Sequence, residues 1–136
     1  MPPDIKADIL NRIFNKHFDD TKEFCRDLYM SFEQMKEMIG QGMSFGCHTH
    51  SHPMLSKLSR DEQIREIGNS KEILESELGT RIEFFSYPYG DFNGATVKIL
   101  SEQGFSCALT TDFSVNNGRE DFFALKRLDT NHLPLY

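Results

Sequence analysis

The chain has 136 residues, of which 38% are hydrophobic and 26% are charged, and this is the length and composition of one globular domain. A formal net charge of −6, with lysine and arginine scattered along the chain, argues against a nucleic-acid-binding or anionic-membrane surface. Three widely spaced cysteines favour reduced thiols over a disulfide framework. The N-terminus has no basic stretch before an apolar run, so we expect no signal peptide, no membrane span and a cytoplasmic location.

The first part of the chain is predicted to be helical. Apolar side chains recur at helical spacing over residues 4–18, and the acidic pair Asp19 and Asp20 then breaks this pattern before a second short helix. Ser31 and Gln34 form a capping box, in which each side chain bonds the backbone of the other, at the start of a third helix. The sequence therefore places a helical segment ahead of the core.

Strands and helices alternate from residue 31 onward. Short apolar strands are predicted at residues 43–47, 82–87, 105–111 and 124–128. A helix after the first strand is predicted to begin at the capping residue Ser59 and end at Gly79. A helix after the second strand is predicted to begin at Asn93 and end at Gly104. This alternation predicts βαβ units, a mostly parallel sheet and helices that cover it. We therefore predict an α/β fold in a single domain of residues 1–136, with a helical segment at 1–30 and the core at 31–130.

The segment SFGCHTHSHP, residues 44–53, holds three of the five histidines of the chain. Neutral imidazole is a common metal ligand, and the four-residue spacing of His48 and His52 allows both rings to face one ion. His50 points away from these two rings if the segment is extended, which favours a position in solvent or behind the ligands. His48 and His52 are therefore the predicted metal ligands.

A second unusual segment, YPYG at residues 87–90, follows the next predicted strand. The C-terminal ends of parallel strands meet at one edge of a sheet, where the chemistry of such folds is usually located. The histidine segment and YPYG are therefore expected to face one pocket.

Three known families use histidine patterns that can be compared with HTHSHP. The metallo-β-lactamase pattern, His-x-His-x-Asp-His, lacks its aspartate here. The PHP phosphoesterases have a His-x-His pair that resembles the HTHS of residues 48–51, but only His17 and His132 remain to complete a multi-metal cluster. The pattern His-Thr-x-x-His-Pro resembles the second motif of the polysaccharide deacetylases, the NodB-homology domain of carbohydrate esterase family 4.

The resemblance to the polysaccharide deacetylases continues downstream in the right order. The second motif is filled by His48, Thr49, His52 and Pro53. The segment FSYPYG at residues 85–90 resembles the third motif, and segments at 109–111 and 125–129 resemble the later strands of the family. The resemblance covers about residues 31–130 and implies a (β/α) barrel.

The resemblance also implies a chemistry. In this family the two histidines that match His48 and His52 bind a divalent metal, usually zinc, and the N-acetyl group of an amino sugar or polysaccharide is hydrolysed. The backbone N–H that stabilises the oxyanion belongs to the tyrosine that matches Tyr89, and a late histidine, matched by His132, protonates the leaving amine. The N-acetylated carbohydrate is expected to contact Tyr87, Pro88, Tyr89 and Gly90.

The first motif of the family, Thr-Phe-Asp-Asp-Gly, has only a superficial match. In FDDT at residues 18–21, Phe18 continues a helical stripe instead of a strand, and no glycine follows the two aspartates. Ser86 stands where many members carry the arginine that orients the catalytic aspartate. We therefore expect a partial NodB-like barrel that lacks its N-terminal strand or strands. Its exposed sheet edge would be covered by the N-terminal helices, a second copy of the chain or the missing segment.

Functions of different classes remain open at this point. The first is a metal-dependent deacetylase acting on an N-acetylated amino sugar or polysaccharide. The second is a non-catalytic, carbohydrate- or partner-binding remnant of that fold, which the unmatched aspartates and Ser86 favour. The third is a PHP-type phosphoesterase, which the HTHS tetrapeptide alone supports.

Overall fold

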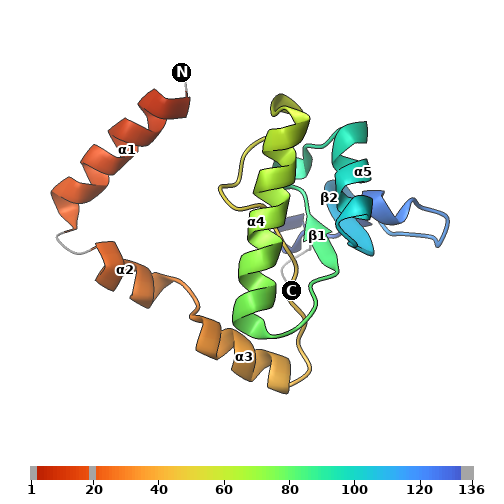
Figure 1. The fold of residues 1–136 in the computed structure, drawn as a ribbon, viewed down its shortest axis with the longest axis horizontal. Helices are drawn as coiled ribbons and strands as arrows, with labels where there is room; N and C mark the ends of the chain where they lie inside the picture. The colour runs from red at the N-terminus through yellow and green to blue at the C-terminus, as the bar shows by residue number, and fades with distance from the viewer. Residues whose placement is uncertain (1–2, 19–20, 133–136) are drawn as a thin grey trace. The chain divides into compact units, whose positions relative to one another are not determined.

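The computed structural model describes residues 3–18 and 21–132. The chain divides into two compact units, Met1–Gly42 and Met43–Tyr136 (Figure 1). No helix in the described ranges is both long and apolar enough to cross a lipid bilayer. The single-domain organisation and the cytoplasmic location stay predictions.

The first unit consists of three helices, α1 (Pro3–His17), α2 (Thr21–Leu28) and α3 (Phe32–Gly40). Three aromatic rings cluster where α1 meets α2: the Phe14 centroid lies 4.5 Å from that of Phe18 and 5.1 Å from that of Phe24. The helix break expected at Asp19 and Asp20 lies outside the described residues.

The predicted capping box at the start of α3 is confirmed. The Ser31 N–H donates to Gln34 Oε1 at 2.8 Å, and the Gln34 N–H donates to Ser31 Oγ at 3.2 Å. These bonds satisfy two of the backbone N–H groups that the first turn of a helix leaves without partners.

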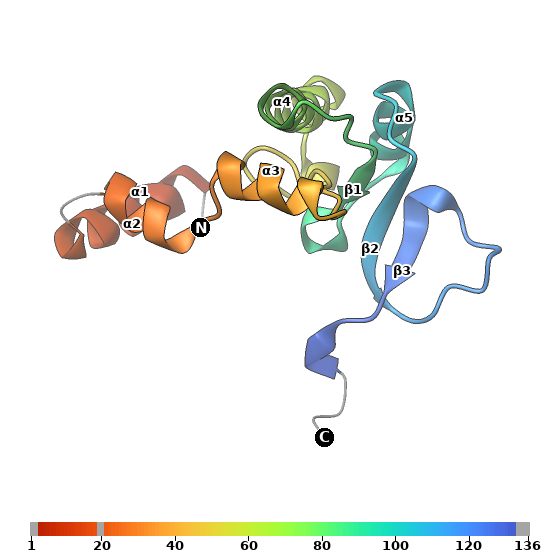
Figure 2. The same ribbon diagram turned by 90° about the horizontal axis from the view of Figure 1, so that it is seen from below.

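The second unit is built on a three-stranded parallel sheet. β1 (Phe84–Ser86), β2 (Cys107–Phe113) and β3 (Leu125–Arg127) lie in the order β1-β2-β3. α4 (Arg60–Leu78) precedes β1, α5 (Gly94–Glu102) connects β1 to β2, and both helices lie on the same side of the sheet (Figure 2). Short 3₁₀ turns occupy Leu55–Lys57, Pro88–Gly90, Phe122–Ala124 and Thr130–His132. The predicted α/β fold with mostly parallel strands is therefore confirmed.

Both long helices of this unit begin where their capping residues predict, and α4 ends at Gly79 as expected, whereas α5 ends at Glu102, two residues before the predicted Gly104. The Glu62 carboxylate accepts the Ser59 N–H at 2.8 Å at the start of α4, and the Asn93 side-chain oxygen accepts two backbone N–H groups at the start of α5. Gly79 ends α4 with a φ of 65°, a left-handed conformation that glycine adopts without steric cost.

The strand predicted at residues 43–47 is wrong except at its last residue. Only Cys47 pairs, in an isolated parallel bridge with Phe85, where the Cys47 N–H donates to Phe84 O at 2.8 Å. β1 itself begins at Phe84, opposite Gly46, so residues 43–45 have no β1 residue opposite them, and Met43 is 54% exposed. The backbone nevertheless runs close to β1, because a Cβ on Gly46 would lie 2.9 Å from Phe84 O.

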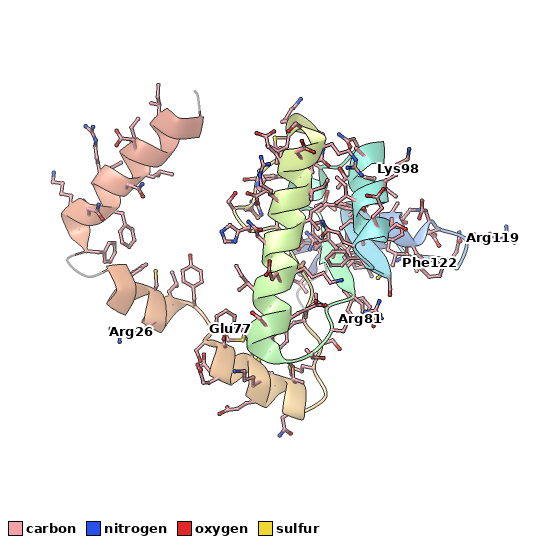
Figure 3. The ribbon with its side chains drawn as sticks, viewed as in Figure 1. Arg26, Glu77, Arg81, Lys98, Arg119 and Phe122 are labelled. Atoms are coloured by element: carbon pink, nitrogen blue, oxygen red, sulfur yellow. The ribbon has the colours of Figure 1, made fainter. Side chains whose placement is uncertain are left out.

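The core of the second unit lies between the sheet and its two helices. Its most deeply buried hydrophobic side chains are Cys47, Leu55, Ile67, Ile82, Phe85, Tyr87, Ile99, Leu100 and Ala108. Phe85 and its pairing partner Ala108 are buried, whereas Phe84, on the alternate face of β1, is 43% exposed. Charged side chains such as Lys98 and Arg119 lie on the outside of this unit (Figure 3). The covering of the exposed sheet edge by the N-terminal helices, a second copy or a missing segment stays a prediction.

Candidate functional site

The His48 ring is fixed by the strand beside it. His48 directly follows the bridging residue Cys47, and its Nδ1 lies 2.7 Å from the backbone oxygen of Ser86 at the end of β1. A carbonyl oxygen can only accept, so Nδ1 is the donor, and in the neutral ring this tautomer leaves the lone pair on Nε2. Histidines that ligate metals are commonly held in this way, with one nitrogen bonded to a protein acceptor and the other available.

The structure brings His52 next to His48. The two ring centroids are 4.7 Å apart, and the His52 ring also lies 4.7 Å from the ring of Tyr89 in an edge-to-face arrangement. Both imidazoles are exposed. The histidine segment and YPYG therefore meet at the C-terminal end of β1, as the topology predicts, although the functional roles of these residues stay predictions.

The backbone around the two histidines adopts a conformation that side chains other than glycine rarely take. Thr49 has a φ of 65°, His52 has a φ of 59° and Tyr89 has a φ of 59°. The Thr49 hydroxyl accepts the His52 N–H at 3.0 Å and so closes the turn between the two histidines. Strained residues of this kind cluster at functional sites, where the surrounding structure holds them in place.

Glu66 of α4 binds the middle of the histidine segment. Its carboxylate accepts the His50 N–H at 3.1 Å, the Ser51 N–H at 2.8 Å and the Ser51 hydroxyl at 2.7 Å. The His50 side chain is exposed, in agreement with a position in solvent instead of among the ligands. Nothing in the local sequence pattern identifies Glu66, because only the packing of α4 against the segment creates these contacts.

The YPYG segment forms a tight 3₁₀ turn. The Gly90 N–H donates to Tyr87 O at 3.0 Å and the Asp91 N–H donates to Pro88 O at 2.9 Å, so the turn does not use the Tyr89 N–H. Gly90 has a φ of 69°, and a Cβ there would meet the Thr111 hydroxyl. The turn thus requires glycine both for its backbone conformation and for its close approach to β2.

Tyr87 and Pro88 are buried behind the turn. The Tyr87 hydroxyl donates to Phe123 O at 2.8 Å, and its ring stacks on Phe92 with centroids 4.3 Å apart. Burial, assisted by the Asp121 carboxylate, raises the pKa of Tyr87 far above its ordinary value. The substrate contacts predicted for Tyr87 and Pro88 stay predictions, and their burial favours a supporting role, whereas Tyr89 is 63% exposed.

Asp91 joins the two segments that form the site. Its carboxylate accepts the Ser56 N–H and the Ser56 hydroxyl, each at 2.7 Å. Ser56 belongs to the 3₁₀ turn that follows the histidine segment, and Asp91 follows YPYG. Both carboxylate oxygens of Asp91 are therefore already engaged.

The remaining predicted residues are placed only in part. His132 ends the short turn Thr130–His132, but its side chain, like Asp19 and Asp20, lies outside the described part of the chain. Within the described part, no three histidine, cysteine, aspartate or glutamate side chains gather to form a metal cluster. The two imidazoles thus fit a metal as two of its ligands, and the described residues offer no complete set.

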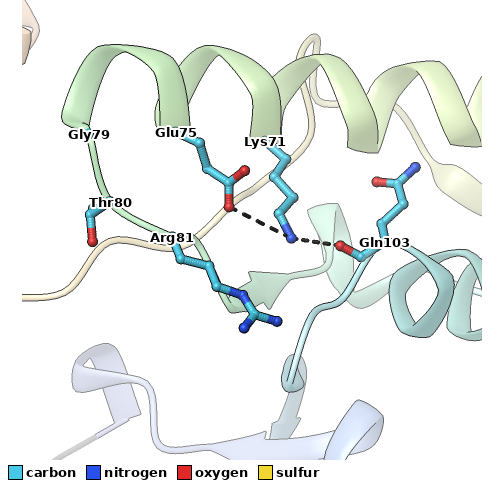
Figure 4. Close-up of a pocket in the computed structure, with 6 residues that line it drawn as sticks. All are labelled: Lys71, Glu75, Gly79, Thr80, Arg81 and Gln103. Atoms are coloured by element: carbon cyan, nitrogen blue, oxygen red, sulfur yellow. Dashed lines mark hydrogen bonds and ion pairs between the residues drawn. The ribbon is translucent and has the colours of Figure 1, made fainter.

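Another concave region lies at the C-terminal end of α4 (Figure 4). It is lined by Lys71, Glu75, Gly79, Thr80, Arg81 and Gln103. Lys71 Nζ donates to Gln103 O at 2.6 Å and lies 3.8 Å from Glu75 Oε1, and Arg81 donates to Gly104 O at 3.3 Å. Because its cations bind protein groups and none of the predicted site residues lies here, this region is not a candidate active site.

Comparison with known proteins agrees with the motifs. The sequence model of the polysaccharide deacetylase family matches residues 14–108. YxkH of Bacillus subtilis strain 168, provisionally named a polysaccharide deacetylase, is 30% identical over 100 residues, which are 74% of this chain and 36% of that protein. The peptidoglycan-N-acetylglucosamine deacetylase of Bacillus cereus is 35% identical over 71 residues, which are 52% of this chain and 26% of that protein.

A solved structure shares the fold. The deacetylase PplD of Streptococcus pyogenes, in complex with acetate, is 32% identical and superposes with a TM-score of 0.70 over 73% of this chain and 44% of that chain. The chain thus spans less than half the length of these relatives, and the prediction of a partial deacetylase fold is confirmed. The match to the family over residues 14–108 places the chain, by sequence and by fold, in the polysaccharide deacetylase family.

Proposed function

We propose that this chain acts in the metal-dependent hydrolysis of the N-acetyl group of an amino sugar or polysaccharide. The observation that carries the proposal is the pairing of the His48 and His52 rings, 4.7 Å apart, beside the YPYG turn. The hydrogen bond from His48 Nδ1 to Ser86 O supports it further, because in the neutral ring it leaves the lone pair on Nε2 for a metal.

His48 and His52 would hold a divalent metal, and zinc fits best because imidazole nitrogens are among its preferred ligands. Bound there, the metal would act as a Lewis acid and lower the pKa of a coordinated water. Zinc usually takes three or four protein ligands, so the proposal requires at least one more. Both oxygens of Asp91 are bonded to Ser56, so this carboxylate is not free to serve, and His132 remains a candidate for a further ligand.

The YPYG turn would stabilise the negative charge that develops on the carbonyl oxygen of the substrate. The proposed donor is the Tyr89 N–H, which the hydrogen bonds of the turn do not use. Pro88 and Gly90 would fix the direction of this N–H, since one is buried and the other packs against Thr111. His132 is the proposed acid for the leaving amine, by its match to the late histidine of the family.

The proposed substrate is an N-acetylated carbohydrate. The relative from Bacillus cereus is named for deacetylation of N-acetylglucosamine in peptidoglycan, and this supports the same substrate class here. The exposed Tyr89 ring beside His52 offers an aromatic face of the kind that sugar rings contact.

A second candidate function is carbohydrate or partner binding without turnover. The absence of a cluster of three metal-binding side chains in the described part of the chain favours it. The PHP-type phosphoesterase still rests on the HTHS tetrapeptide alone, and no contact among the described residues adds to it.

The two candidates are separated by zinc calorimetry on chelator-stripped protein, followed by an assay for acetate release from chito-oligomers. The deacetylase proposal expects one zinc per chain in the wild type, loss of binding in His48→Ala and in His52→Ala, and wild-type binding in the control His50→Ala. Acetate release that the first two substitutions abolish would support it. Sugar binding without acetate release would favour the second candidate, and zinc binding that is indifferent to both substitutions would contradict the first.

A further inference from the structure

We propose that Glu66 is a positioning residue that holds the histidine segment in the shape that brings His48 and His52 together. The proposal rests on the proposed function for its consequence, since holding the two rings together matters to a reaction only if they bind a metal. Its geometric basis is independent of the metal and consists of hydrogen bonds, backbone conformation and the rigidity of α4.

Glu66 binds two of the three residues that link the two proposed ligands. One oxygen of its carboxylate accepts the N–H groups of His50 and Ser51, at 3.1 and 2.8 Å, and the other accepts the Ser51 hydroxyl at 2.7 Å. The His50 N–H is shared with the backbone oxygen of Glu66, also at 3.1 Å, so the bonds to Ser51 are the ones that depend on the carboxylate alone. Only Thr49, His50 and Ser51 separate His48 from His52. A single side chain from another element thus fixes two of the three linking residues.

The link needs an anchor of this kind because it is strained at both ends. Thr49 and His52 have φ values of 65° and 59°, which persist in side-chain-bearing residues only where neighbouring contacts over-determine them. The bond from the His52 N–H to the Thr49 hydroxyl is internal to the segment and cannot tie it to the fold. The bonds to Glu66 tie the middle of the segment to α4.

The two histidines depend on this anchor to different degrees. His48 follows the Cys47 bridge and is bonded to Ser86 O, so β1 fixes it directly. In the described part of the chain, the His52 ring makes edge-to-face contacts with His48 and Tyr89 instead of a hydrogen bond. Loss of Glu66 should therefore displace His52 relative to His48.

The helix that carries Glu66 is well fixed. The next residue, Ile67, is fully buried, and the buried Gln63 side chain donates to Leu58 O at 3.1 Å and accepts the Thr96 hydroxyl at 2.7 Å. Alanine is the best helix-forming residue, so Glu66→Ala should leave α4 intact. An effect of this substitution on metal binding would thus report on the segment and not on the helix.

The test compares Glu66→Ala and Glu66→Gln with Glu72→Ala, which removes an exposed carboxylate from the same helix. Zinc affinity is measured by calorimetry, and the unfolding midpoint of the metal-free protein is measured in parallel. Glu66→Ala should raise the zinc Kd about tenfold or more, as is typical of residues that orient metal ligands. Glu66→Gln, which keeps one acceptor oxygen, should raise it less. Glu72→Ala should bind zinc like the wild type, and all midpoints should stay close together.

Wild-type zinc affinity in Glu66→Ala would overturn the proposal, and so would an equal loss of affinity in Glu72→Ala. If the wild type binds no zinc, the proposed function fails on its own. The positioning role of Glu66 is then tested by the nuclear Overhauser effect between the ring protons of His48 and His52. A signal that is present in the metal-free wild type and lost in Glu66→Ala would support the positioning role. Its persistence in Glu66→Ala, or its absence from the wild type, would overturn that role.

Discussion

Ser56 and Asp91 are joined by two hydrogen bonds of 2.7 Å each, one from the Ser56 N–H and one from its hydroxyl, although 35 residues separate them in the sequence. This pair connects the turn after the histidine segment to the residue after YPYG. The ring of His52 and the ring of Tyr89, which lie 4.7 Å apart, are thus held by segments that are also bonded to each other. The site is a pair of linked loops and not two independent ones.

We predict that Asp91→Ala destabilises the protein by about 1–3 kcal/mol, because it leaves the partly buried Ser56 N–H and hydroxyl without their shared acceptor. The free energy of unfolding in urea measures this effect. Asp112→Ala is the matched control, since Asp112 is exposed and no hydrogen bond of its carboxylate is found among the described residues. Equal unfolding free energies for the two variants would contradict the linkage of the loops.

We predict that Gly90→Ala is more destabilising than an ordinary glycine replacement at a positive φ. Gly90 has a φ of 69°, and an added Cβ would lie 3.1 Å from both the Cβ and the backbone nitrogen of Thr111 and closer still to its hydroxyl. The left-handed conformation should cost about 1–2 kcal/mol and the overpacking about 1–3 kcal/mol more. Urea unfolding gives the total cost.

Gly118→Ala separates these two contributions. Gly118 has a φ of 82°, but an added Cβ there would meet nothing within 4 Å. It should therefore show the conformational cost alone. The double variant Gly90→Ala/Thr111→Ala should recover part of the overpacking cost, and no recovery at all would argue against the contact with Thr111 as its source.

We predict that the protein loses stability at alkaline pH through Tyr87. The pKa of this buried phenol is raised in the folded state, first by desolvation and then by the Asp121 carboxylate. The unfolded chain releases the proton at an ordinary pKa of about 10, so the stabilisation is complete below that pH and is lost as the pH rises above it. Over that range, Tyr87 should contribute up to about 1.4 kcal/mol per pH unit to the fall.

Comparison of the wild type with Tyr87→Phe isolates this effect. Burial also raises the pKa of the Cys47 thiol, which acts in the same direction, but Cys47 is present in both proteins. Tyr87→Phe should be less stable at neutral pH by about 0.5–1.5 kcal/mol, since it loses the bond to Phe123 O, and its stability should fall less steeply above pH 10. Parallel curves for the two proteins would show that Tyr87 does not titrate with unfolding.

The helices could be predicted from the sequence because their ends are set by local chemistry. Ser59 and Asn93 bond to backbone groups within three residues, and Gly79 needs only its own conformational freedom. The proximity of the His48 and His52 rings could also be predicted, because a spacing of four residues limits how far apart the two rings can lie. The family motifs pointed to the same two residues.

The contacts that hold the site could not be predicted, because they join residues that only the tertiary fold brings together. Glu66 lies 15 residues beyond Ser51, and on sequence grounds it is one of several polar residues on the outer face of a helix. Asp91 directly follows YPYG, and nothing in its local sequence indicates its two bonds to Ser56, 35 residues earlier. The first predicted strand fails for a similar reason. Of residues 43–47 only Cys47 forms a bridge with β1, and the local apolar pattern does not show how many partners a strand will find.

We predict that the hydroxyl of Thr49, and not its shape, is what the histidine turn requires. In the wild type, the Thr49 hydroxyl accepts the His52 N–H at 3.0 Å, and Thr49→Ser keeps this acceptor. The same substitution removes a β-branch that is unfavourable at a φ of 65°. Thr49→Ala removes the acceptor. The Ser variant should therefore retain the wild-type protection of the His52 amide against hydrogen exchange. The Ala variant should exchange about fivefold faster, which corresponds to one hydrogen bond of about 1 kcal/mol.

Amide exchange of His52, followed by nuclear magnetic resonance in the metal-free protein, checks this prediction without any assumption about a metal. The Ser51 amide, which donates to Glu66, is the internal control and should exchange at similar rates in all three proteins. Equal exchange of the His52 amide in the Ser and Ala variants would show that the turn does not depend on the hydroxyl. Faster exchange of both amides in Thr49→Ala would mean that the whole segment had detached from α4, because a purely local bond cannot expose the Ser51 amide.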